Sequence, residues 1–529
     1  MEKINPPWLE SLLDPRSYPE RPKEVRLIQT HLSWVFMAGR FVYKVKKPVD
    51  FGFLDFTTLD KRKFYCSEEI RLNRRLCPEI YLSVVPVTRE TDSSYILEGK
   101  GEPVEWAVKM KRMPEDGLMS TLIKRDEVDK KDMDTICNIL VPFYEKAKAG
   151  QDKLWLGGIE VVRENCEENF QQTRDFVGKV IPEDTFDKIM NYTRAFLEEN
   201  ERLFKKRQAK GWIVEGHGDL YSANICIDRE KDKIYIFDCI EFNERFRYGD
   251  VAVDVAFLAM DLDFLGLCDL SDYFIGSFKK MMNDEDLQAL LDFYKCYRAY
   301  VRGKIGCFTW ASPEVDEETR DSSLSMAKRY FKLALRYAGG RGKRPLLFVF
   351  MGLSGTGKST VSKALSARLG IAAFNSDFVR KEYVSGIPAE EKRLEPFGQG
   401  IYSREFTEKT YRALCRLAGQ RLVVGESAIL DATYIDPEKR KRVRELAKAC
   451  GARLILIHCT CPENVAIQRM KKRLEGENAV SDGRLEIYEK QKQIFKRPDP
   501  DEADLVMELD TTKEVDELLR TLEDLVKKQ

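Results

Sequence analysis

A continuous apolar run at residues 346–351 lies in the C-terminal third of the chain, and it predicts a β-strand buried on both faces. The stretch that follows at 361–369 has the spacing of an amphipathic helix. Shorter apolar segments at 371–375, 428–430 and 454–458 fit further strands. Strands that alternate with helices form a parallel sheet with helices on both faces. The pattern therefore predicts a three-layer α/β domain.

The first two thirds of the chain show a different pattern. Residues 30–36 and 40–46 alternate between apolar and polar side chains, and Met37-Ala38-Gly39 joins them, which predicts a β-hairpin. Residues 62–76 then have the spacing of a charged amphipathic helix. This part of the chain is thus expected to begin with a hairpin that a helix follows.

A clear boundary separates the two parts. Residues 339–345 contain three glycines, three cations and a proline, which cannot continue a helix. We therefore predict domains at 1–338 and 346–529 with a linker at 339–345. The length of 529 residues suits two to four lobes, and 43% hydrophobic with 33% charged residues is typical of a globular protein and not of a disordered one.

The charge and cysteine content narrow the function classes. Lys plus Arg (88) equals Asp plus Glu (88), which excludes a surface that attracts polyanions everywhere but permits a local basic groove. No apolar run reaches the roughly 18 residues that cross a bilayer, and residues 1–7 lack the apolar core of a signal peptide. The thirteen cysteines are scattered, and Cys459 with Cys461 alone is poor zinc spacing. We expect a cytoplasmic protein with reduced thiols and no membrane contact.

The segment Gly352–Thr360 has the pattern G-x-x-x-x-G-K-S between the predicted strand and helix. Glycines let consecutive backbone N–H groups turn toward phosphate oxygens, and the helix N-terminus adds partial positive charge. Lys358 is expected to reach the β- and γ-phosphates, and the Ser359 hydroxyl to bind Mg²⁺. The predicted nucleotide-binding residues are Gly352, Ser354, Gly355, Thr356, Gly357, Lys358, Ser359 and Thr360.

Further polar residues follow the predicted strands of this domain. Asp377 comes after the segment 371–375, and Asp431 after 428–430. Ligands bind at the carboxyl edge of an open parallel sheet, so both aspartates are expected to face the phosphate loop. Asp377 is a candidate general base and Arg380 a candidate ligand for an anionic acceptor, while Asp431 positions Mg²⁺-bound water or contacts the acceptor. The alternative for each aspartate is a cap of the next helix.

Arg469 and Arg473 lie four residues apart, on one face of a predicted helix. Two guanidinium groups there can close over a triphosphate as a lid. The alternative is a solvated charged face.

These C-terminal motifs together resemble the polynucleotide-kinase/zeta-toxin type of small P-loop kinase over about 345–510. The resemblance implies Asp377 as the base, Arg380 as an acceptor ligand, and Arg469 with Arg473 as the lid. It does not identify the acceptor, because members of that group phosphorylate nucleic-acid ends, sugars, antibiotics and nucleotide-sugars.

The segment 217–224, His-Gly-Asp-Leu-Tyr-Ser-Ala-Asn, is the centre of the N-terminal signal. Asp219 and Asn224 have the spacing of a protein-kinase catalytic loop, with the aspartate as base and the asparagine on the metal. Two short predicted strands follow, and the second ends at Asp238. An antiparallel hairpin places Asn224 beside Asp238, and two such oxygen ligands suit Mg²⁺. Downstream, Asp250 and Asp254 are expected to cap a helix and brace this loop.

Two lysines of the first hairpin are candidates to pair the nucleotide phosphates. Lys44 and Lys46 share one face of the strand, and Lys44 is preferred. Glu69 of the following helix is expected to orient the lysine, although Glu68 is adjacent and the choice stays open. A solvent-facing lysine is the alternative.

The N-terminal motifs resemble the aminoglycoside-phosphotransferase-like branch of the protein-kinase fold over about 25–310. The pattern departs from protein kinases because Thr30-His31-Leu32-Ser33-Trp34 stands where a Gly-rich phosphate loop is expected. The fusion also resembles a bacterial family labelled bifunctional aminoglycoside phosphotransferase/ATP-binding protein, but antibiotic modification does not follow from that label.

We therefore expect an α+β bilobal kinase-like domain followed by a three-layer α/β parallel-sheet P-loop domain. The predicted function is an ATP-dependent phosphotransferase with two Mg²⁺-ATP sites and a hydroxyl acceptor of unidentified structure. One alternative is a nucleotide-binding regulator with an inactive kinase-like domain. Another is an RNA- or DNA-end kinase, which the basic run at 439–444 motivates; nucleic acid is a possible but not a favoured partner.

Overall fold

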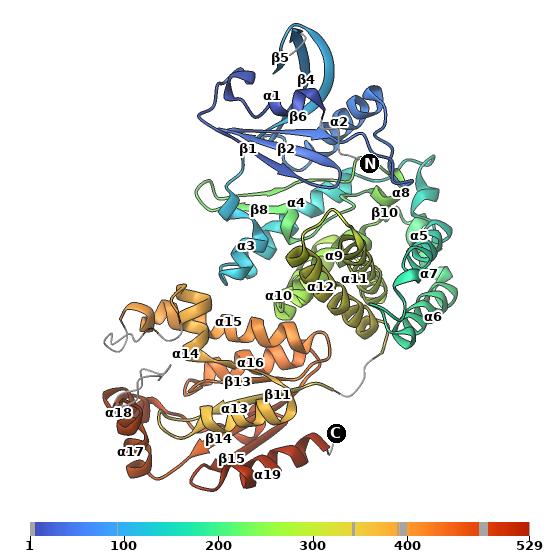
Figure 1. Cartoon of the computed structure of the whole chain (residues 1–529). Helices are drawn as coiled ribbons and strands as arrows, with labels where there is room; N and C mark the ends of the chain where they lie inside the picture. The colour runs from blue at the N-terminus through green and yellow to red at the C-terminus, as the bar shows by residue number, and fades with distance from the viewer. Residues whose placement is uncertain are drawn as a thin grey trace.

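The computed structural model describes residues 6–91, 94–340, 344–388, 391, 399–474 and 485–527. A lobe built on a β-sheet, a helical lobe and an α/β domain follow one another from the N-terminus to the C-terminus (Figure 1). Helix α12 ends at Tyr337, two residues before the linker predicted at 339–345, and 341–343 of that linker lie outside the described residues. The exact domain boundary stays a prediction.

The N-terminal sheet has six antiparallel strands in the order β1-β2-β3-β6-β4-β5. Helix α2 packs against β4 and β6, and its N-cap Thr58 accepts a hydrogen bond from the Lys61 amide, so the helix begins three residues before the predicted start. The elements of this lobe are α1 (Pro7–Ser11), β1 (Val25–Gln29), β2 (Ser33–Ala38), β3 (Phe41–Lys46), α2 (Leu59–Asn73), β4 (Tyr81–Thr91), β5 (Ser94–Leu97) and β6 (Glu102–Lys111).

The strand predicted at 30–36 begins too early, because residues 30–32 form the turn between β1 and β2. The Thr30 hydroxyl accepts hydrogen bonds from the amides of Leu32 and Ser33, at 3.3 Å and 2.9 Å, and so closes a tight turn. Strand β2 begins only at Ser33 and continues through Ala38, and the reversal to β3 falls at Gly39 with φ +61°. The turn at 30–32 lies where the Gly-rich loop of a kinase is expected.

The second lobe is mainly helical, and helix α9 forms its centre. Every residue of α9 except Val253 is buried, and the helix begins where the Asp250 carboxylate accepts a hydrogen bond from the Ala252 amide. The elements are α3 (Met119–Lys124), α4 (Lys130–Lys146), α5 (Ile159–Gln172), α6 (Glu183–Glu199), α7 (Glu201–Ala209), β7 (Ile213–Glu215), β8 (Ile225–Asp228), β9 (Lys233–Ile236), α8 (Glu244–Arg247), β10 (Tyr248–Asp250), α9 (Val251–Phe264), α10 (Cys268–Met282), α11 (Leu287–Ala311) and α12 (Glu317–Tyr337).

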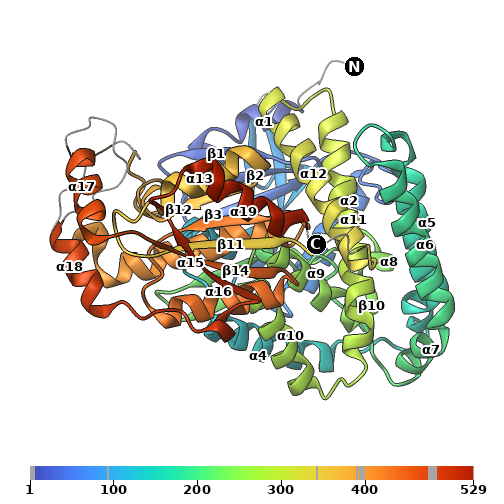
Figure 2. The same ribbon diagram turned by 90° about the horizontal axis from the view of Figure 1, so that it is seen from below.

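The C-terminal domain is built on five parallel strands in the order β12-β13-β11-β14-β15. All six residues of central strand β11 are buried, as the unbroken apolar run predicts. Helices α13 and α19 cover one face and α15 and α16 the other (Figures 1 and 2). The elements are β11 (Leu346–Met351), α13 (Lys358–Leu369), β12 (Ala372–Asn375), α14 (Ser376–Phe378), α15 (Arg404–Leu422), β13 (Ala428–Asp431), α16 (Pro437–Ala449), β14 (Arg453–Thr460), α17 (Glu463–Leu474), α18 (Leu485–Ile494), β15 (Leu505–Asp510) and α19 (Val515–Lys527).

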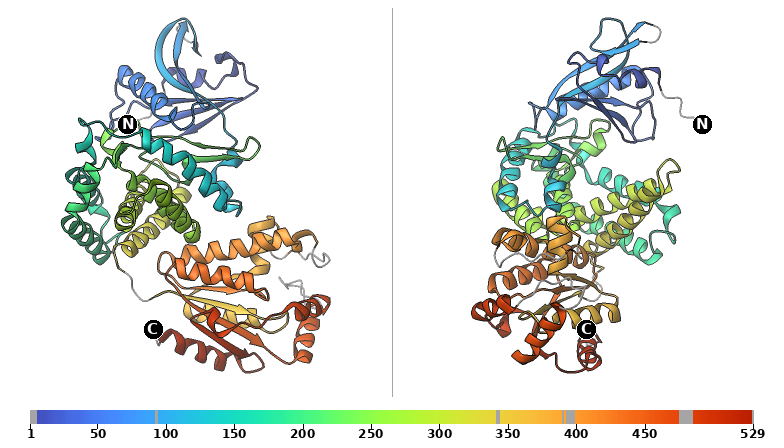
Figure 3. Two further views of the ribbon diagram at one scale, coloured as in Figure 1. Left: turned by 180° about the vertical axis from the view of Figure 1, so that it is seen from behind. Right: turned by 60° about the vertical axis from the view of Figure 1, so that its left-hand side comes forward.

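Helices α15 and α16 also face the helical lobe (Figure 3). At this contact Arg416 donates to Asp126 at 2.9 Å, with both side chains buried, and buried apolar residues of both parts form one continuous cluster. Among the described residues, no helix is long and apolar enough to span a membrane.

Candidate functional sites

Three glycines shape the phosphate loop between β11 and α13. Gly352, Gly355 and Gly357 have φ values of +135°, +81° and +83°, which side chains rarely tolerate. A Cβ atom on Gly352 would lie 2.5 Å from the Cys459 carbonyl oxygen, and one on Gly355 would lie 2.7 Å from that of Ala466. Glycine is therefore required here by both backbone conformation and space.

Lys358 is the first residue of α13, and its ammonium group turns back over the loop. Its Nζ donates to the Leu353 carbonyl at 2.7 Å. The amide and hydroxyl of Ser354 both donate to Gln491 Oε1 of α18, each at 3.0 Å. A glutamine more than a hundred residues away thus contacts the loop, and no sequence motif indicates it.

Asp431 lies at the end of β13, where its carboxylate has one used and one unused oxygen. Its Oδ2 accepts hydrogen bonds from Ser362 Oγ at 3.2 Å and from Asn375 Nδ2 at 2.7 Å. Its Oδ1 is buried and has no hydrogen-bond partner among the described residues. The same Asn375 amide lies 3.4 Å from Ser359 Oγ. A buried carboxylate oxygen close to the loop serine fits a hard cation such as Mg²⁺.

The strand register explains why Asn375 belongs to this site. Strands β12 and β13 pair in parallel with Asn375 opposite Asp431, so both side chains emerge at the same sheet edge. Asn375 also caps α14, and Asp436 caps α16. Asp377 and Asp431 are therefore not the N-caps of these two helices, so helix capping does not explain either aspartate.

Arg380 and Asp377 form an ion pair with a separation of 3.0 Å. The Arg380 guanidinium is stacked over Tyr402 at 4.8 Å from the ring centroid, and its Nε is buried without a hydrogen-bond partner in the described part of the chain. Lys439 lies over Tyr411, and burial lowers its pKa, with Arg380 and Arg442 contributing further. Arg380, Lys439 and Arg442 thus lie near one another, and Glu408 is the carboxylate partner of the last two.

Arg469 is fixed beside the phosphate loop by residue Thr511, which follows β15. Its Nη1 donates to Thr511 Oγ1 at 3.0 Å and its Nη2 to the Thr511 carbonyl at 2.8 Å. A Cβ on Gly357 would lie 3.1 Å from Nη1, so the guanidinium touches the loop. The side chain of Arg473 lies outside the described residues, and the lid role of both arginines stays a prediction.

In the N-terminal part, Lys44 joins two carboxylates across the two lobes. Its Nζ lies 2.7 Å from Asp238 Oδ1 and 3.0 Å from Glu69 Oε1. Lys46 pairs with the other oxygen of Glu69 at 2.7 Å and with Glu241. Burial raises the pKa of Glu69, but the two ammonium groups outweigh burial and keep this pKa below its ordinary value.

Glu68 takes no part in this network. It pairs with Arg71 of the same helix at 2.8 Å. The open choice between the two glutamates is thereby decided in favour of Glu69, which is fully buried. Glu241, a further member of the network, has no signal in the sequence.

The segment 217–224 is fixed by hydrogen bonds to Asp254 of α9. The Asp254 carboxylate accepts hydrogen bonds from the amides of His217 and Gly218, at 2.7 Å and 2.9 Å, so the bracing role predicted for Asp254 is confirmed. The buried His217 ring contacts the Phe237 carbonyl through Nε2 at 2.9 Å. These contacts fix the backbone on both sides of Asp219.

Asp219 and Asn224 lie together within this loop. Asn224 Nδ2 donates to the Asp219 carbonyl at 2.9 Å and to its Oδ2 at 3.0 Å. Burial raises the pKa of Asp219 to about 6, against the attraction of Arg302. A carboxylate with such a pKa is suited to accept a proton near neutral pH.

Asn224 and Asp238 flank the β8–β9 hairpin as expected. The Phe237 amide donates to the Asn224 carbonyl at 3.0 Å, and Ile225 pairs with Ile236. Asp238 has φ +66°, a conformation that aspartate adopts only occasionally. Oxygen donors from two adjacent chain segments fit Mg²⁺ better than a softer metal.

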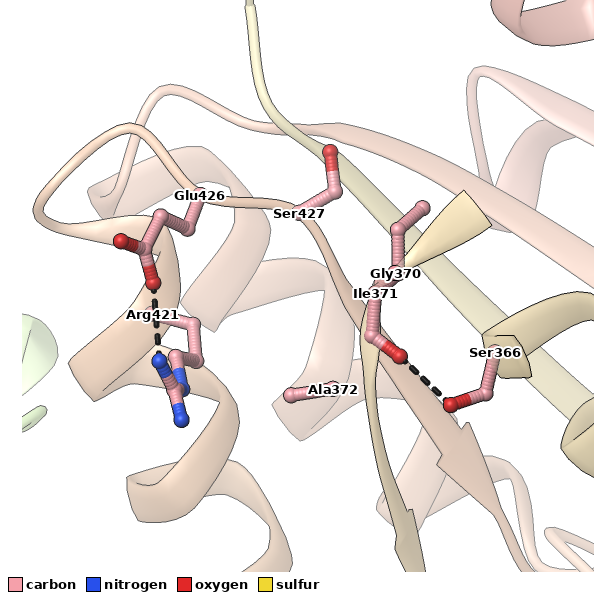
Figure 4. A pocket seen from close by; sticks show the side chains of 7 residues that line it. All are labelled: Ser366, Gly370, Ile371, Ala372, Arg421, Glu426 and Ser427. Carbon is pink, nitrogen blue, oxygen red and sulfur yellow. Dashed lines mark hydrogen bonds and ion pairs between the residues drawn. The ribbon is translucent and has the colours of Figure 1, made fainter. Parts of the chain in front are cut away.

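A separate cavity of about 470 Å³ lies in the C-terminal domain (Figure 4). It is lined by Ser366, Gly370, Ile371, Ala372, Arg421, Glu426 and Ser427. Ala372 begins β12 and Ser427 precedes β13, so the cavity lies at the sheet edge opposite the phosphate loop. Arg421 and Glu426 lie on the same side of it and form an ion pair at 2.9 Å (Figure 4). It is not part of the nucleotide site.

Comparison with known proteins identifies relatives. An AAA domain model matches residues 347–498. The uncharacterized protein Rv2004c of Mycobacterium tuberculosis is 31% identical over 463 residues, which cover 87% of this chain and 88% of that protein. The protein Mb2027c of Mycobacterium bovis matches equally. The chain belongs to the family of these mycobacterial proteins. Its C-terminal part is a P-loop kinase-like domain with a parallel sheet.

Other matches cover single parts of the chain. Adenylyl-sulfate kinase of Myxococcus xanthus is 30% identical over 188 residues, which cover 34% of this chain and 89% of that protein. A choline/ethanolamine kinase family structure from Mesorhizobium loti has 11% identity and a TM-score of 0.38, covering 62% of this chain and 98% of that one. The Mycobacterium tuberculosis APS kinase CysC has 20% identity and a TM-score of 0.26, covering 35% and 97%.

Proposed function

We propose that this protein is an ATP-dependent phosphotransferase with two Mg²⁺-ATP sites, each of which transfers a γ-phosphate to a hydroxyl group. The observation that carries the proposal is the Lys44–Glu69–Asp238 network beside Asp219. These residues come from distant segments of the chain, and the packing of a core alone gives no reason to bring such charged groups together. The P-loop domain supplies the second site.

The chemistry at both sites is mainly positioning and neutralisation of charge. In the first domain Lys44 binds phosphate oxygens, Asn224 and Asp238 hold Mg²⁺, and Asp219 accepts the proton of the acceptor hydroxyl. In the second, the loop amides and Lys358 bind the phosphates, Ser359 and Asp431 hold Mg²⁺, and Asp377 accepts the proton. Bound Mg²⁺ neutralises the charge that develops on the phosphate oxygens.

The acceptor of the P-loop site is proposed to be a negatively charged hydroxyl compound. Arg380 supplies the supporting charge, because its guanidinium pairs with Asp377 while its Nε is buried with no hydrogen-bond partner in the described part of the chain. The related adenylyl-sulfate kinase bears the name of such an anionic acceptor, which supports the class of compound and not that particular acceptor.

The number of nucleotide sites is the first test. We expect calorimetry to find two Mg²⁺-ATP per wild-type chain, one in Lys358→Ala, one in Asp238→Ala and none in the double variant. Lys441→Ala, at an exposed position, is the matched control and retains two. A single site in wild type that Lys358→Ala leaves intact would refute the P-loop site.

Phosphate transfer is the second test, because an ATP-binding regulator also predicts two sites. The Thr30–Ser33 turn, closed by its own hydrogen bonds, favours this second candidate for the N-terminal domain. An ATP-consumption screen over metabolites and RNA ends decides between them when wild type is compared with Asp219→Asn and Asp377→Asn. If Asp219→Asn changes no turnover, the N-terminal domain is a binding module.

The nucleic-acid-end alternative loses support from the packing of the basic run at 439–444. Arg440 is buried and pairs with Glu502, and Arg442 pairs with Glu408 at 3.2 Å. Lys441 and Arg444 are the exposed members. Labelled phosphate on 5′-hydroxyl oligonucleotides, lost in Asp377→Asn, would restore this alternative.

A further inference from the structure

Helix α11 places two arginines beside the catalytic loop of the N-terminal domain. Arg298 and Arg302 are four residues apart and therefore lie on one helix face. Both act electrostatically on the Asp219 carboxylate, and Arg302 acts more strongly than Arg298. The side of the proposed base that faces α11 is thus cationic.

The charge of Arg298 is already compensated. Its Nη2 lies 3.7 Å from Asp254 Oδ1, its Nε donates to the Val253 carbonyl at 3.3 Å, and its guanidinium lies over Phe257 at 4.7 Å. Since Asp254 also holds the catalytic-loop backbone, Arg298 belongs to the supporting structure.

Arg302 has a different environment. Its guanidinium lies 4.9 Å from the ring centroid of Tyr221 and 5.8 Å from that of Tyr330. Its Nε is buried without a hydrogen-bond partner, and no carboxylate within the described chain forms an ion pair with it at 4.0 Å or less. The residue as a whole remains partly exposed.

The aromatic neighbours hold this cation at the catalytic loop and leave donors free. Tyr221 is two residues after Asp219, and its ring stacks on Phe257 at 5.4 Å. Arg302 also attracts the Asp261 carboxylate electrostatically. That carboxylate, however, accepts a hydrogen bond from the Ser222 amide at 2.9 Å. A planar guanidinium with free N–H groups binds carboxylate or phosphate through two parallel hydrogen bonds.

We propose that the N-terminal domain phosphorylates an anionic hydroxyl compound, whose phosphate or carboxylate group Arg302 binds while Asp219 faces its hydroxyl. This inference rests on the proposed phosphotransferase function. In the reaction the acceptor oxygen forms a bond to the γ-phosphorus, the bond from that phosphorus to the ADP oxygen breaks, and the hydroxyl proton passes to Asp219. A polycationic aminoglycoside would be repelled by Arg302 at this position.

The test uses the full chain with Lys358→Ala, which silences the P-loop site. ATP consumption is measured with four acceptors of one scaffold and different charge: glucose, glucosamine, gluconate and glucose 6-phosphate. We expect transfer to an anionic member, with a KM that Arg302→Gln raises at least tenfold and Arg302→Lys raises less. Lys304→Gln removes one charge from the same helix and leaves this KM unchanged, because Lys304 contacts Asn169 and Gln172 instead.

If the protein phosphorylates none of the four acceptors, the binding of inorganic phosphate tests the role of Arg302 instead. Inorganic phosphate is titrated by calorimetry into the Mg²⁺-AMPPNP complex of the same chain, and we expect Arg302→Gln to weaken its binding at least fivefold. No phosphate binding, equal binding in both proteins, or a preference for glucose or glucosamine overturns the inference.

Two further measurements distinguish acceptor binding by Arg302 from an effect on Asp219 and from loss of the nucleotide site. If Arg302 only stabilises the Asp219 anion, Arg302→Gln shifts the pH profile equally for all acceptors, and the inference is wrong. If AMPPNP binding at the N-terminal site is absent and Asp238→Ala changes nothing, the proposed function itself fails there, independently of Arg302.

Discussion

Lys44 and Lys46 are two residues apart on β3, but their ammonium groups have different surroundings. The Lys44 side chain is 19% exposed and reaches Asp238 on the other lobe. The Lys46 side chain is 1% exposed and lies between Glu69 and Glu241. The first lysine is thus partly accessible and contacts the other lobe, whereas the second neutralises two buried carboxylates.

Methionine substitutions should separate these two roles. Lys44→Met is expected to abolish turnover at the N-terminal site with little loss of stability, because Glu69 keeps Lys46. Lys46→Met leaves buried carboxylates uncompensated and should lower the free energy of unfolding by about 3–5 kcal/mol. Urea denaturation and ATP consumption, both in the Lys358→Ala chain, measure the two effects. Equal loss of stability in both variants would contradict this division.

Asp219 should control the pH dependence of the N-terminal reaction. Its pKa of about 6 lies above the ordinary value of 3.8 because burial disfavours the anion. The proton-accepting form therefore grows as pH rises through about 6, and kcat/KM should rise there and level off above pH 7. A pH profile of kcat/KM checks this, and a profile that is flat between pH 5 and 7 would exclude Asp219 as the base.

The same shift has an opposite consequence for stability. Because the folded pKa is raised, the fold favours protonated Asp219, and this favourable contribution is lost as pH rises from about 4 through 6. Asp219→Asn should therefore melt at a higher temperature than wild type at pH 7.5 while losing turnover. A lower melting temperature would show that the Asp219 anion stabilises the fold.

At the scale of elements, helix α13 begins and ends at a glycine in the left-handed region. Gly357 precedes the helix with φ +83°, and Gly370 follows it with φ +65°. A Cβ on Gly357 would meet Thr511 at 3.0 Å, whereas one on Gly370 meets nothing within 4 Å. The two positions therefore share backbone strain and differ in contacts.

Alanine at these two positions should distinguish strain from function. Gly370→Ala is expected to cost about 1–2 kcal/mol of stability through left-handed strain and to retain ATP binding at the P-loop. Gly357→Ala bears the same strain but also displaces Thr511 or Arg469, and it should abolish that binding. Calorimetry in the Asp238→Ala background measures the P-loop site alone, and equal affinity in both variants would contradict the expectation.

At the scale of the whole molecule, two glycines bring the domains into direct backbone contact. A Cβ on Gly419 of α15 would lie 2.4 Å from the Gly266 carbonyl oxygen, and one on Gly266 would lie 2.2 Å from that of Arg416. The buried Arg416–Asp126 pair lies in the same interface, where burial raises the pKa of Asp126 against the attraction of Arg416. Close packing of this kind couples the two domains.

Gly419→Ala should weaken this coupling. Alanine suits the helix, but its methyl group cannot fit against Gly266. We expect differential scanning calorimetry to show two separated unfolding transitions in place of one merged transition. Gly276→Ala is the matched control, since Gly276 is a helical glycine in α10 with nothing within 4 Å, and it should be neutral or stabilising by up to about 1 kcal/mol. A single unchanged transition in Gly419→Ala would show that the contact is dispensable.

Most features that the sequence predicted depend on residues that are close together in the chain. The phosphate loop, the buried strand β11 and the Asp219–Asn224 spacing are local, because one backbone segment fixes how their members lie relative to each other. The parallel P-loop kinase-like domain was predicted for this reason and is confirmed. Strand β1 was missed because the hydroxyl of Thr30 closes a turn that no glycine marks.

Only packing across distant segments decided the remaining features. The choice of Glu69 over Glu68 follows from which side of α2 lies against the sheet, where Glu69 meets the lysines of β3 while Glu68 pairs with Arg71 of its own helix. Asn375 reaches Asp431 through strand register, across 56 residues. Arg302 lies over Tyr221 because α11 packs against α9. Such contacts depend on the summed burial of whole elements, which no short pattern of residues records.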